Sequence, residues 1–183
     1  MRRIIASEMV TVDGFFSGPN GELDWFVQDE ELGTFAQELL DSVDTILYGR
    51  ATYEMMVGCW PHAGGSFAER TNPLPKLVFT STLDPTPWGD WDNATPVKGV
   101  LADEVAKLKD EAGGDMVIYG SGRVVQALSR LGLIDEYRLV VHPVLLGIGR
   151  PLFGALAKRH TRRLIDSVSW PSGCVALTYE PAD

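Results

Sequence analysis

Short apolar runs alternate with segments of helical periodicity along most of this chain, and this order constrains the fold more than any other feature. Strands are predicted over residues 2–12, 45–48, 76–80, 116–119 and 136–142. Helices are predicted over residues 29–42, 51–57 and 101–112, and over a segment that carries Val124, Val125, Leu128 and Leu131. Because a strand–helix–strand crossover makes neighbouring strands parallel, the order predicts a mostly parallel sheet with helices on both faces.

The C-terminal part departs from this alternation. Segments 161–169 and 174–180 alternate apolar and polar residues on either side of Trp170-Pro171-Ser172-Gly173, which predicts an antiparallel hairpin. Residues 61–75 are predicted to form a loop, and residues 85–96 an irregular segment. The expected architecture is therefore a three-layer α/β/α domain that spans residues 1–183 as one unit.

Composition excludes several classes of protein. The net charge of −9 disfavours a nucleic-acid binder, because phosphate contacts supply most of the affinity of such proteins. No apolar stretch approaches the ~18 residues of a membrane helix. Cys59 and Cys174 are far apart, and the three histidines are scattered, so we expect a reduced cytoplasmic protein without a metal site.

Two segments share one design, in which a buried strand ends in glycine and a helix begins at once. The first elbow is Gly49-Arg50-Ala51-Thr52, and the second elbow is Gly120-Ser121-Gly122-Arg123. The N-terminus of a helix presents unpaired N–H groups and partial positive charge, which suit a phosphate. Arginine adds a planar fork that matches phosphate oxygens. Each elbow taken alone also fits an ordinary strand–helix turn with a solvated arginine.

The second elbow begins like the glycine-rich fingerprint of dinucleotide-binding Rossmann domains. Val125 stands where the third glycine of that fingerprint belongs, and the motif follows a late strand of the chain. A Rossmann domain is therefore disfavoured. Two elbows in one small chain nevertheless suit a ligand with separate phosphate groups.

The chain resembles the dihydrofolate reductase superfamily, and more closely its bacterial branch related to the reductase domain (RibD C-terminal domain) of bifunctional riboflavin-biosynthesis proteins. The resemblance covers nearly the whole chain and depends on the order and spacing of several modest motifs. These motifs are Thr11-Val12-Asp13-Gly14-Phe15, Gly21-Glu22-Leu23-Asp24-Trp25, residues 47–54, Gly113-Gly114-Asp115, residues 119–122, Gly132-Leu133-Ile134-Asp135-Glu136 and residues 143–153.

The resemblance implies NADPH as cofactor and a dihydrofolate reductase-like mixed sheet. Gly49, Arg50, Ala51 and Thr52 match a segment that holds cofactor phosphates. Thr80 and Ser81 match the region beside the adenosine 2′-phosphate. The pyrophosphate loop is matched by Tyr119, Gly120, Ser121, Gly122, Arg123 and Val124. Related reductases have a cis Gly–Gly peptide there, so a cis Gly120–Ser121 bond is a hypothesis for this chain.

The sequence indicates the catalytic residues less clearly than the residues that would bind the cofactor. Dihydrofolate reductases use a carboxylic acid near the start of their first helix, and the matching position falls near Gly33, which carries no acid. Glu31 is a candidate, although first-turn acids such as Glu30 and Glu31 also fit the helix dipole. Asp13 is a second candidate, which either orients substrate or caps the turn at Asp13-Gly14.

Aromatic residues are expected near the substrate. Trp25 and Tyr53 are candidates for substrate binding, with packing in the core as the alternative for each. His142, which precedes Pro143, fits a hydrogen-bonded histidine at a strand end better than a base. Residues 143–153 are apolar and glycine-rich enough to serve an interface, and the resemblance implies a homodimer.

Together these features favour an NADPH-dependent reductase that acts on a small planar heterocycle, such as a pteridine or a ribosylated aminopyrimidine. The alternative is a nucleotide-binding protein of the same fold that acts by interaction alone, without catalysis.

Overall fold

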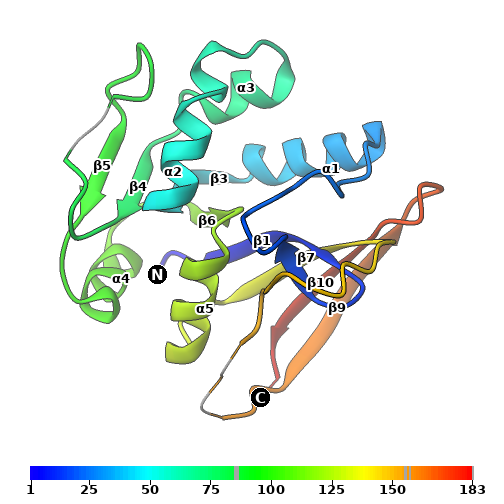
Figure 1. Cartoon of the computed structure of the whole chain (residues 1–183). Coiled ribbons are helices and arrows are strands. Elements are labelled where there is room, and N and C mark those ends of the chain that lie inside the picture. Colours follow the sequence, from blue (N-terminus) through cyan, green and yellow to red (C-terminus); the bar gives the residue numbers. More distant parts are fainter. Residues whose placement is uncertain (85–86, 155, 157, 183) are drawn as a thin grey trace.

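The computed structural model describes residues 1–84, 87–154, 156 and 158–182. Within these residues, eight strands form one mixed sheet in the order β5-β4-β3-β6-β1-β7-β10-β9 (Figure 1). Their bounds are β1 Ile4–Thr11, β3 Val43–Gly49, β4 Lys76–Phe79, β5 Ala94–Val97, β6 Asp115–Tyr119, β7 Glu136–His142, β9 Arg162–Ser169 and β10 Val175–Pro181. The short strands β2 (Phe15–Ser17) and β8 (Arg150–Pro151) form a separate antiparallel pair.

The strand directions agree with the predicted architecture. The six strands from β5 to β7 are parallel to their neighbours, whereas β10 runs antiparallel to both β7 and β9. The mostly parallel sheet and the C-terminal hairpin are therefore confirmed. Because the carboxyl ends of parallel strands share one edge, β1, β3, β4, β6 and β7 all deliver the residues that follow them to the same side of the molecule.

Helices cover both faces of the sheet (Figure 1). Their bounds are α1 Glu30–Asp41, α2 Arg50–Val57, α3 Ser66–Thr71, α4 Leu101–Asp110 and α5 Gly122–Leu131. The strand β3 shows the arrangement: Leu47 packs with α4 and α5, whereas Ile46 and Tyr48 pack with α1 and α2. A strand buried on both faces has a continuous apolar sequence, which is why residues 45–48 are readable as a strand.

Two segments are more regular than their sequences indicate. The predicted loop over residues 61–75 contains most of a short 3₁₀ helix, Trp60–His62, and all of α3. The predicted irregular segment over residues 85–96 contains most of β5, although residues 85 and 86 lie outside the described residues. Such short elements are stabilised by packing, as the burial of Ala68 in α3 shows, and they are too short to display a periodicity.

A buried lysine organises the segment before β5. Lys76 is fully buried, donates from Nζ to the carbonyl oxygen of Asn72 at 2.6 Å, and lies 4.4 Å from the ring centroid of Trp88. Burial lowers the pKa of Lys76 to about 7. The Asn72 side chain accepts a hydrogen bond from the Trp88 indole at 2.8 Å. Trp88 is fully buried and is therefore a core residue.

In the part of the chain that the structure describes, no helix combines the length and apolar character needed to cross a membrane.

Candidate functional site

The two elbows lie side by side at the carboxyl edge of the sheet, because the strands that precede them, β3 and β6, are neighbours. Two hydrogen bonds link them. The Gly49 N–H donates to Oγ of Ser121 at 3.2 Å, and Oγ1 of Thr52 donates to the carbonyl oxygen of Gly120 at 3.1 Å. The structure therefore brings together the two segments that the sequence marks as phosphate cradles.

The second elbow turns through a glycine in the left-handed region. Gly120 has φ +64°, a conformation that glycine adopts without steric cost. The Gly120–Ser121 peptide bond is trans, so the hypothesis of a cis bond is wrong for this chain. The left-handed Gly120 makes the turn into α5, and the N–H groups of Val124 and Val125 then bond to the Ser121 carbonyl oxygen at 2.8 and 3.0 Å.

Close packing explains why both elbows contain glycine. A Cβ atom placed on Gly49 would lie 3.0 Å from Cγ2 of Val124, which joins the first elbow to α5. A Cβ atom on Gly122 would lie 2.8 Å from the ring of Phe16. Phe16 therefore covers the start of α5 from the β2 segment. Sequence analysis did not single out this residue, because nothing local distinguishes it from the adjacent Phe15.

Arg50 connects the first elbow with the segment after β4. Its Nε donates to Oε1 of Glu54 at 2.8 Å, and its Nη1 donates to Oγ1 of Thr82 at 2.6 Å. Oγ1 of Thr80 accepts the N–H groups of Thr82 and Leu83, which shapes this segment into a tight turn. The guanidinium thus lies beside the Thr80 and Ser81 positions and stays about half exposed. Ala51 and Arg123 are exposed in the first turns of their helices.

The carboxyl group of Glu8 lies beneath the second elbow. Glu8 belongs to β1, is only 3% exposed, and accepts a hydrogen bond from the backbone N–H of Ser121. Its Oε1 atom is buried and has no hydrogen-bond partner among the residues that the structure describes. Burial raises the pKa of Glu8 well above its ordinary value, and the Ser121 N–H opposes this shift only in part. The structure thus contains a carboxylic acid favoured in its protonated form.

Tyr119 shares this environment. Burial is the main cause that raises the pKa of its phenol, and the neighbouring Glu8 raises it further. Glu8 was missed in the sequence because a single acid in an apolar strand resembles an outward-facing residue. Its position between Ala6 and Val10, which pack into the core from the same face of the strand, is the signal that identifies it.

The two acids predicted from the sequence have other surroundings. Asp13 accepts hydrogen bonds from the hydroxyl of Thr11 and from the N–H groups of Leu146 and Gly147, at 2.5, 3.2 and 2.7 Å. These bonds, led by that of Thr11, lower the pKa of Asp13. Asp13 thus anchors the loop after β7 and stays exposed at the carboxyl edge.

Glu31 is exposed in the first turn of α1, where Asp29 caps the helix by accepting the N–H groups of Glu31 and Leu32. No hydrogen bond or ion pair among the described residues connects the Glu31 side chain with either elbow. Gly33, the position that matches the acid of dihydrofolate reductases, has open space where a side chain would begin.

The predicted aromatic residues occupy two separate places. Tyr53 lies on the buried side of α2. It is 1% exposed, and its ring centroid is 5.9 Å from that of Trp88. Trp25 is 8% exposed and meets the ring of His142 edge-on at 5.4 Å. The structure therefore places Tyr53 in the core and Trp25 near the end of β7.

His142 is fully buried next to Trp25. Its Nδ1 accepts the N–H of Val27 at 3.1 Å, so the proton of the neutral ring is on Nε2, which has no partner among the described residues. Burial lowers the pKa of His142, which favours this neutral form. The sequence predicts a hydrogen-bonded histidine at this strand end, and the structure shows such a hydrogen bond at Nδ1.

Comparisons with known proteins agree with this geometry. The model of the RibD C-terminal domain family matches residues 2–176. The uncharacterized protein YyaP of Bacillus subtilis (strain 168) is 35% identical over 184 aligned positions, which cover 97% of this chain and 94% of that protein.

Solved structures share the fold over its whole length. A putative riboflavin biosynthesis protein from Shewanella sp. PV-4 has a TM-score of 0.84 and 27% identity, with 99% of each chain covered. Dihydrofolate reductase from Enterococcus faecalis, complexed with NADP(H), has a TM-score of 0.65 and 16% identity, with 99% of this chain and 97% of that chain covered. The fold, the family match and these relatives agree in one conclusion: the chain belongs to the RibD C-terminal domain family.

Proposed function

We propose that this chain is an NADPH-dependent reductase of a small planar heterocycle of the pteridine or ribosylated aminopyrimidine type. The observation that carries the proposal is the union of the two elbows at one edge of the sheet, with the Arg50 guanidinium directed to the turn after β4. This arrangement offers two helix N-termini and a cation within one site, which suits a ligand with a pyrophosphate and a further phosphate.

The residues present fit such a cofactor. A Cβ atom on Gly49 or Gly122 would meet Val124 or Phe16, so each elbow is packed closely against its neighbours. Both α2 and α5 begin at the carboxyl edge of the sheet, where a phosphate would meet the N-terminus of a helix. Arg50 already holds the hydroxyl of Thr82, and a 2′-phosphate placed between them would receive charge-assisted hydrogen bonds. The solved relative with bound NADP(H) supports the same choice of cofactor.

The bound cofactor would supply the hydride, and the chain would position both partners and provide the proton. When a C=N bond is reduced, hydride adds to carbon and a proton adds to nitrogen. Glu8 is suited to hold that proton because burial raises the pKa of its carboxyl group, and Oε1 has no hydrogen-bond partner in the described part of the chain. Glu8 therefore supplies the kind of acid that Gly33 and the exposed Glu31 do not.

The second candidate function is a nucleotide-binding protein that acts by interaction alone. It is favoured by the absence of an acid at Gly33 and by the engagement of Asp13 with the loop after β7. Both candidates require cofactor binding, and only the reductase requires Glu8 to act on a substrate.

The test compares Arg50→Ala with the unchanged chain in calorimetric titrations with NADPH and NADH. We expect NADPH affinity to fall about tenfold to 100-fold, as for loss of hydrogen bonds to a charged group, and NADH affinity to change much less. Arg70→Ala is the matched control, because Arg70 pairs with Asp41 on α1 and lies away from the elbows in sequence and in contacts. Equal losses for both cofactors would argue against a 2′-phosphate contact.

Oxidation of NADPH is then followed with a dihydropteridine and with a ribosylated aminopyrimidine. Turnover of either substrate supports the reductase. Saturable NADPH binding with no turnover of any such compound would favour the second candidate, and absence of binding would exclude both.

A further inference from the structure

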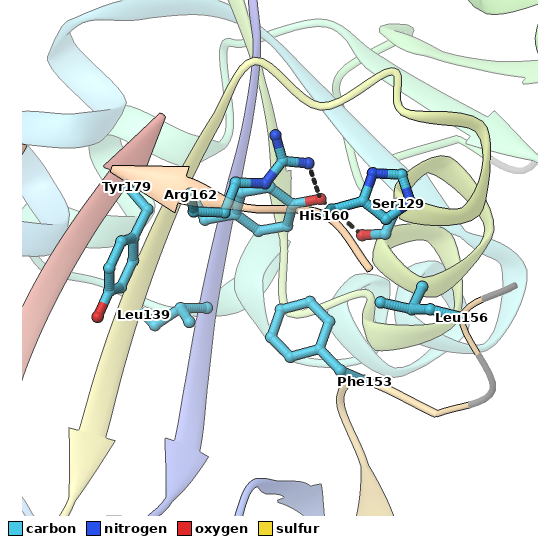
Figure 2. Close-up of a pocket in the computed structure, with 8 residues that line it drawn as sticks. Ser129, Leu139, Phe153, Leu156, His160, Arg162 and Tyr179 are labelled. Carbon is cyan, nitrogen blue, oxygen red and sulfur yellow. Dashed lines mark hydrogen bonds between the residues drawn. The ribbon is translucent and has the colours of Figure 1, made fainter. Parts of the chain in front are cut away.

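A cavity of about 290 Å³ lies between α5 and the C-terminal half of the sheet, away from both elbows. Tyr137 of β7 lines it. Ser129 reaches it from α5, Leu139 from β7, Tyr179 from β10 and Arg162 from β9, while Phe153 closes one side (Figure 2). Tyr137 is the second residue of β7, and the carboxyl edge of the sheet begins where that strand ends, at His142. Ser129 is seven residues after the start of α5, which corresponds to about 10 Å along the helix. The cavity is therefore distinct from the proposed cofactor site.

The polar groups of the cavity converge on one phenol. The hydroxyl of Tyr137 shares a 2.8 Å hydrogen bond with Oγ of Ser129, and both residues are buried. Nη2 of Arg162 donates to the same hydroxyl at 3.4 Å, and the guanidinium carbon lies 4.9 Å from the ring centroid of Tyr137 (Figure 2). This combination holds the guanidinium in place, and the Tyr137 hydroxyl is the one hydrogen-bond acceptor that the described residues offer to its five N–H donors.

Within the part of the chain that the structure describes, Arg162 has no acidic partner, unlike its neighbour Arg163. Arg163 pairs with Glu180 at 3.5 Å, and Glu180 also pairs with Arg3. Among the residues that the structure describes, no carboxylate lies within ion-pair distance of Arg162, and none of the residues that line the cavity is acidic. A guanidinium held against an aromatic ring can offer its remaining N–H donors to a carboxylate or phosphate group.

The sequence around Arg162 strengthens this charge. Residues 158–163 read Lys-Arg-His-Thr-Arg-Arg and contain four of the 16 basic residues of a chain whose net charge is −9. His160 from this run also lines the cavity. Clustered basic residues beside a cavity favour the approach of a small anion.

The remaining walls are apolar and aromatic. Leu139, Phe153, Tyr179 and the ring of Tyr137 surround the cavity, with the Phe153 and Tyr137 centroids 5.8 Å apart. A volume of about 290 Å³ lies at the lower limit of ligand pockets, which suits one or two fused rings and excludes a dinucleotide. We propose that this cavity is a second binding site, specific for a small aromatic carboxylate whose anionic group meets Arg162 and whose ring packs against Phe153 and Tyr179.

The experiment titrates the chain of residues 1–183 with 2-naphthoate and with its neutral isostere, 2-naphthamide, and follows backbone amide shifts by NMR. We expect saturable binding of the carboxylate, shifts concentrated at Ser129, Tyr137, Leu139 and Tyr179, and at least tenfold weaker binding of the amide. Saturation with NADP should leave the carboxylate affinity unchanged, because the two sites are separate. This comparison needs no substitution, so it does not depend on the folding of a variant.

Arg162→Met should weaken 2-naphthoate at least tenfold, whereas Arg163→Met, which removes a cation already paired with Glu180, should leave it within about twofold. The idea is overturned if 2-naphthoate does not bind at millimolar concentration, or if acid and amide bind equally. Displacement by NADP, or an equal effect of the two arginine variants, would overturn it as well. None of these outcomes bears on the reductase proposal, which is tested at Arg50.

Discussion

At the scale of single residues, Glu8 is the group whose chemistry differs most from what its sequence position suggests. A glutamate in a strand is ordinarily ionised and solvated. Glu8 instead has its carboxyl group bonded to the Ser121 N–H, and its Oε1 atom is buried with no partner among the described residues. Burial of an unpaired carboxyl oxygen costs less free energy in the protonated state, which is the state that a proton donor requires.

Glu8→Gln tests the role of this proton. The amide keeps the shape of the side chain but cannot donate a proton to substrate, so kcat should fall about 100-fold or more while NADPH affinity stays within about twofold. Steady-state kinetics combined with NADPH titration separates the two effects. Unchanged kcat in the variant would remove Glu8 from the mechanism.

The same substitution has a consequence for stability as a function of pH. Because the folded pKa of Glu8 is raised, the native state binds more protons than the unfolded state above the unfolded pKa, near 4.5. The free energy of unfolding should therefore decrease as pH rises from about 4.5 toward the folded pKa, and Glu8→Gln should abolish this decrease. Urea denaturation of the unchanged chain and of the variant at several pH values measures how the free energy of unfolding depends on pH.

Glu136→Gln is the matched control for that measurement. Glu136 is also buried, but it pairs with Arg3 at 2.8 Å and with Arg138 at 2.6 Å. Loss of its charge leaves Arg138 without an acidic partner among the described residues and leaves Arg3 with Glu180 alone, so this variant should be less stable at neutral pH. If both glutamine variants changed stability in the same direction at neutral pH, the protonated state assigned to Glu8 would be incorrect.

At the scale of elements, the hydrogen bond from Thr52 to Gly120 couples α2 with the end of β6. It spans 68 positions of sequence and fixes the distance between the two proposed phosphate cradles. Precise spacing of the cradles matters because a dinucleotide must satisfy both at once.

Thr52→Val removes this hydrogen bond with little change of shape. We expect a loss of about 1 kcal/mol of unfolding free energy and a fall in NADPH affinity. Thr34→Val is the control, because Oγ1 of Thr34 makes a similar bond to the Glu30 carbonyl oxygen on the exposed side of α1. Thermal denaturation and calorimetric titration of both variants measure the outcome. Equal affinities for NADPH in the two variants would show that the link between elbows does not matter for binding.

At the scale of the whole molecule, the loop after β7 displays unusual apolar exposure. Leu145 and Ile148 are each 73% exposed, while Asp13 holds the loop through the N–H groups of Leu146 and Gly147. A loop that is held in place and exposes apolar side chains suits an interface. We propose that it contributes to a homodimer.

The double substitution Leu145→Asp with Ile148→Asp should convert such a dimer to a monomer, because it places four carboxylates in one symmetric interface. Sedimentation velocity at micromolar concentration measures the change. Val100→Asp is the control, since Val100 is 67% exposed at the start of α4. A monomeric unchanged chain, or a dimer that survives the double substitution, would contradict the proposal.

The sequence by itself determined the layered architecture and the position of the two elbows. Both depend on local signals: the apolar runs, the helical spacing of residues such as Leu128 and Leu131, and glycine at the strand ends. The tertiary structure decided which residues from distant segments are in contact, which those local signals do not specify. It placed Glu8 under Ser121, buried Tyr53 against Trp88, turned the second elbow through a trans peptide, and set Arg162 against the ring of Tyr137 with no acidic partner among the described residues. These features depend on which segments meet across the sheet, and burial, hydrogen bonding and charge pairing exist only after distant residues have been brought into contact.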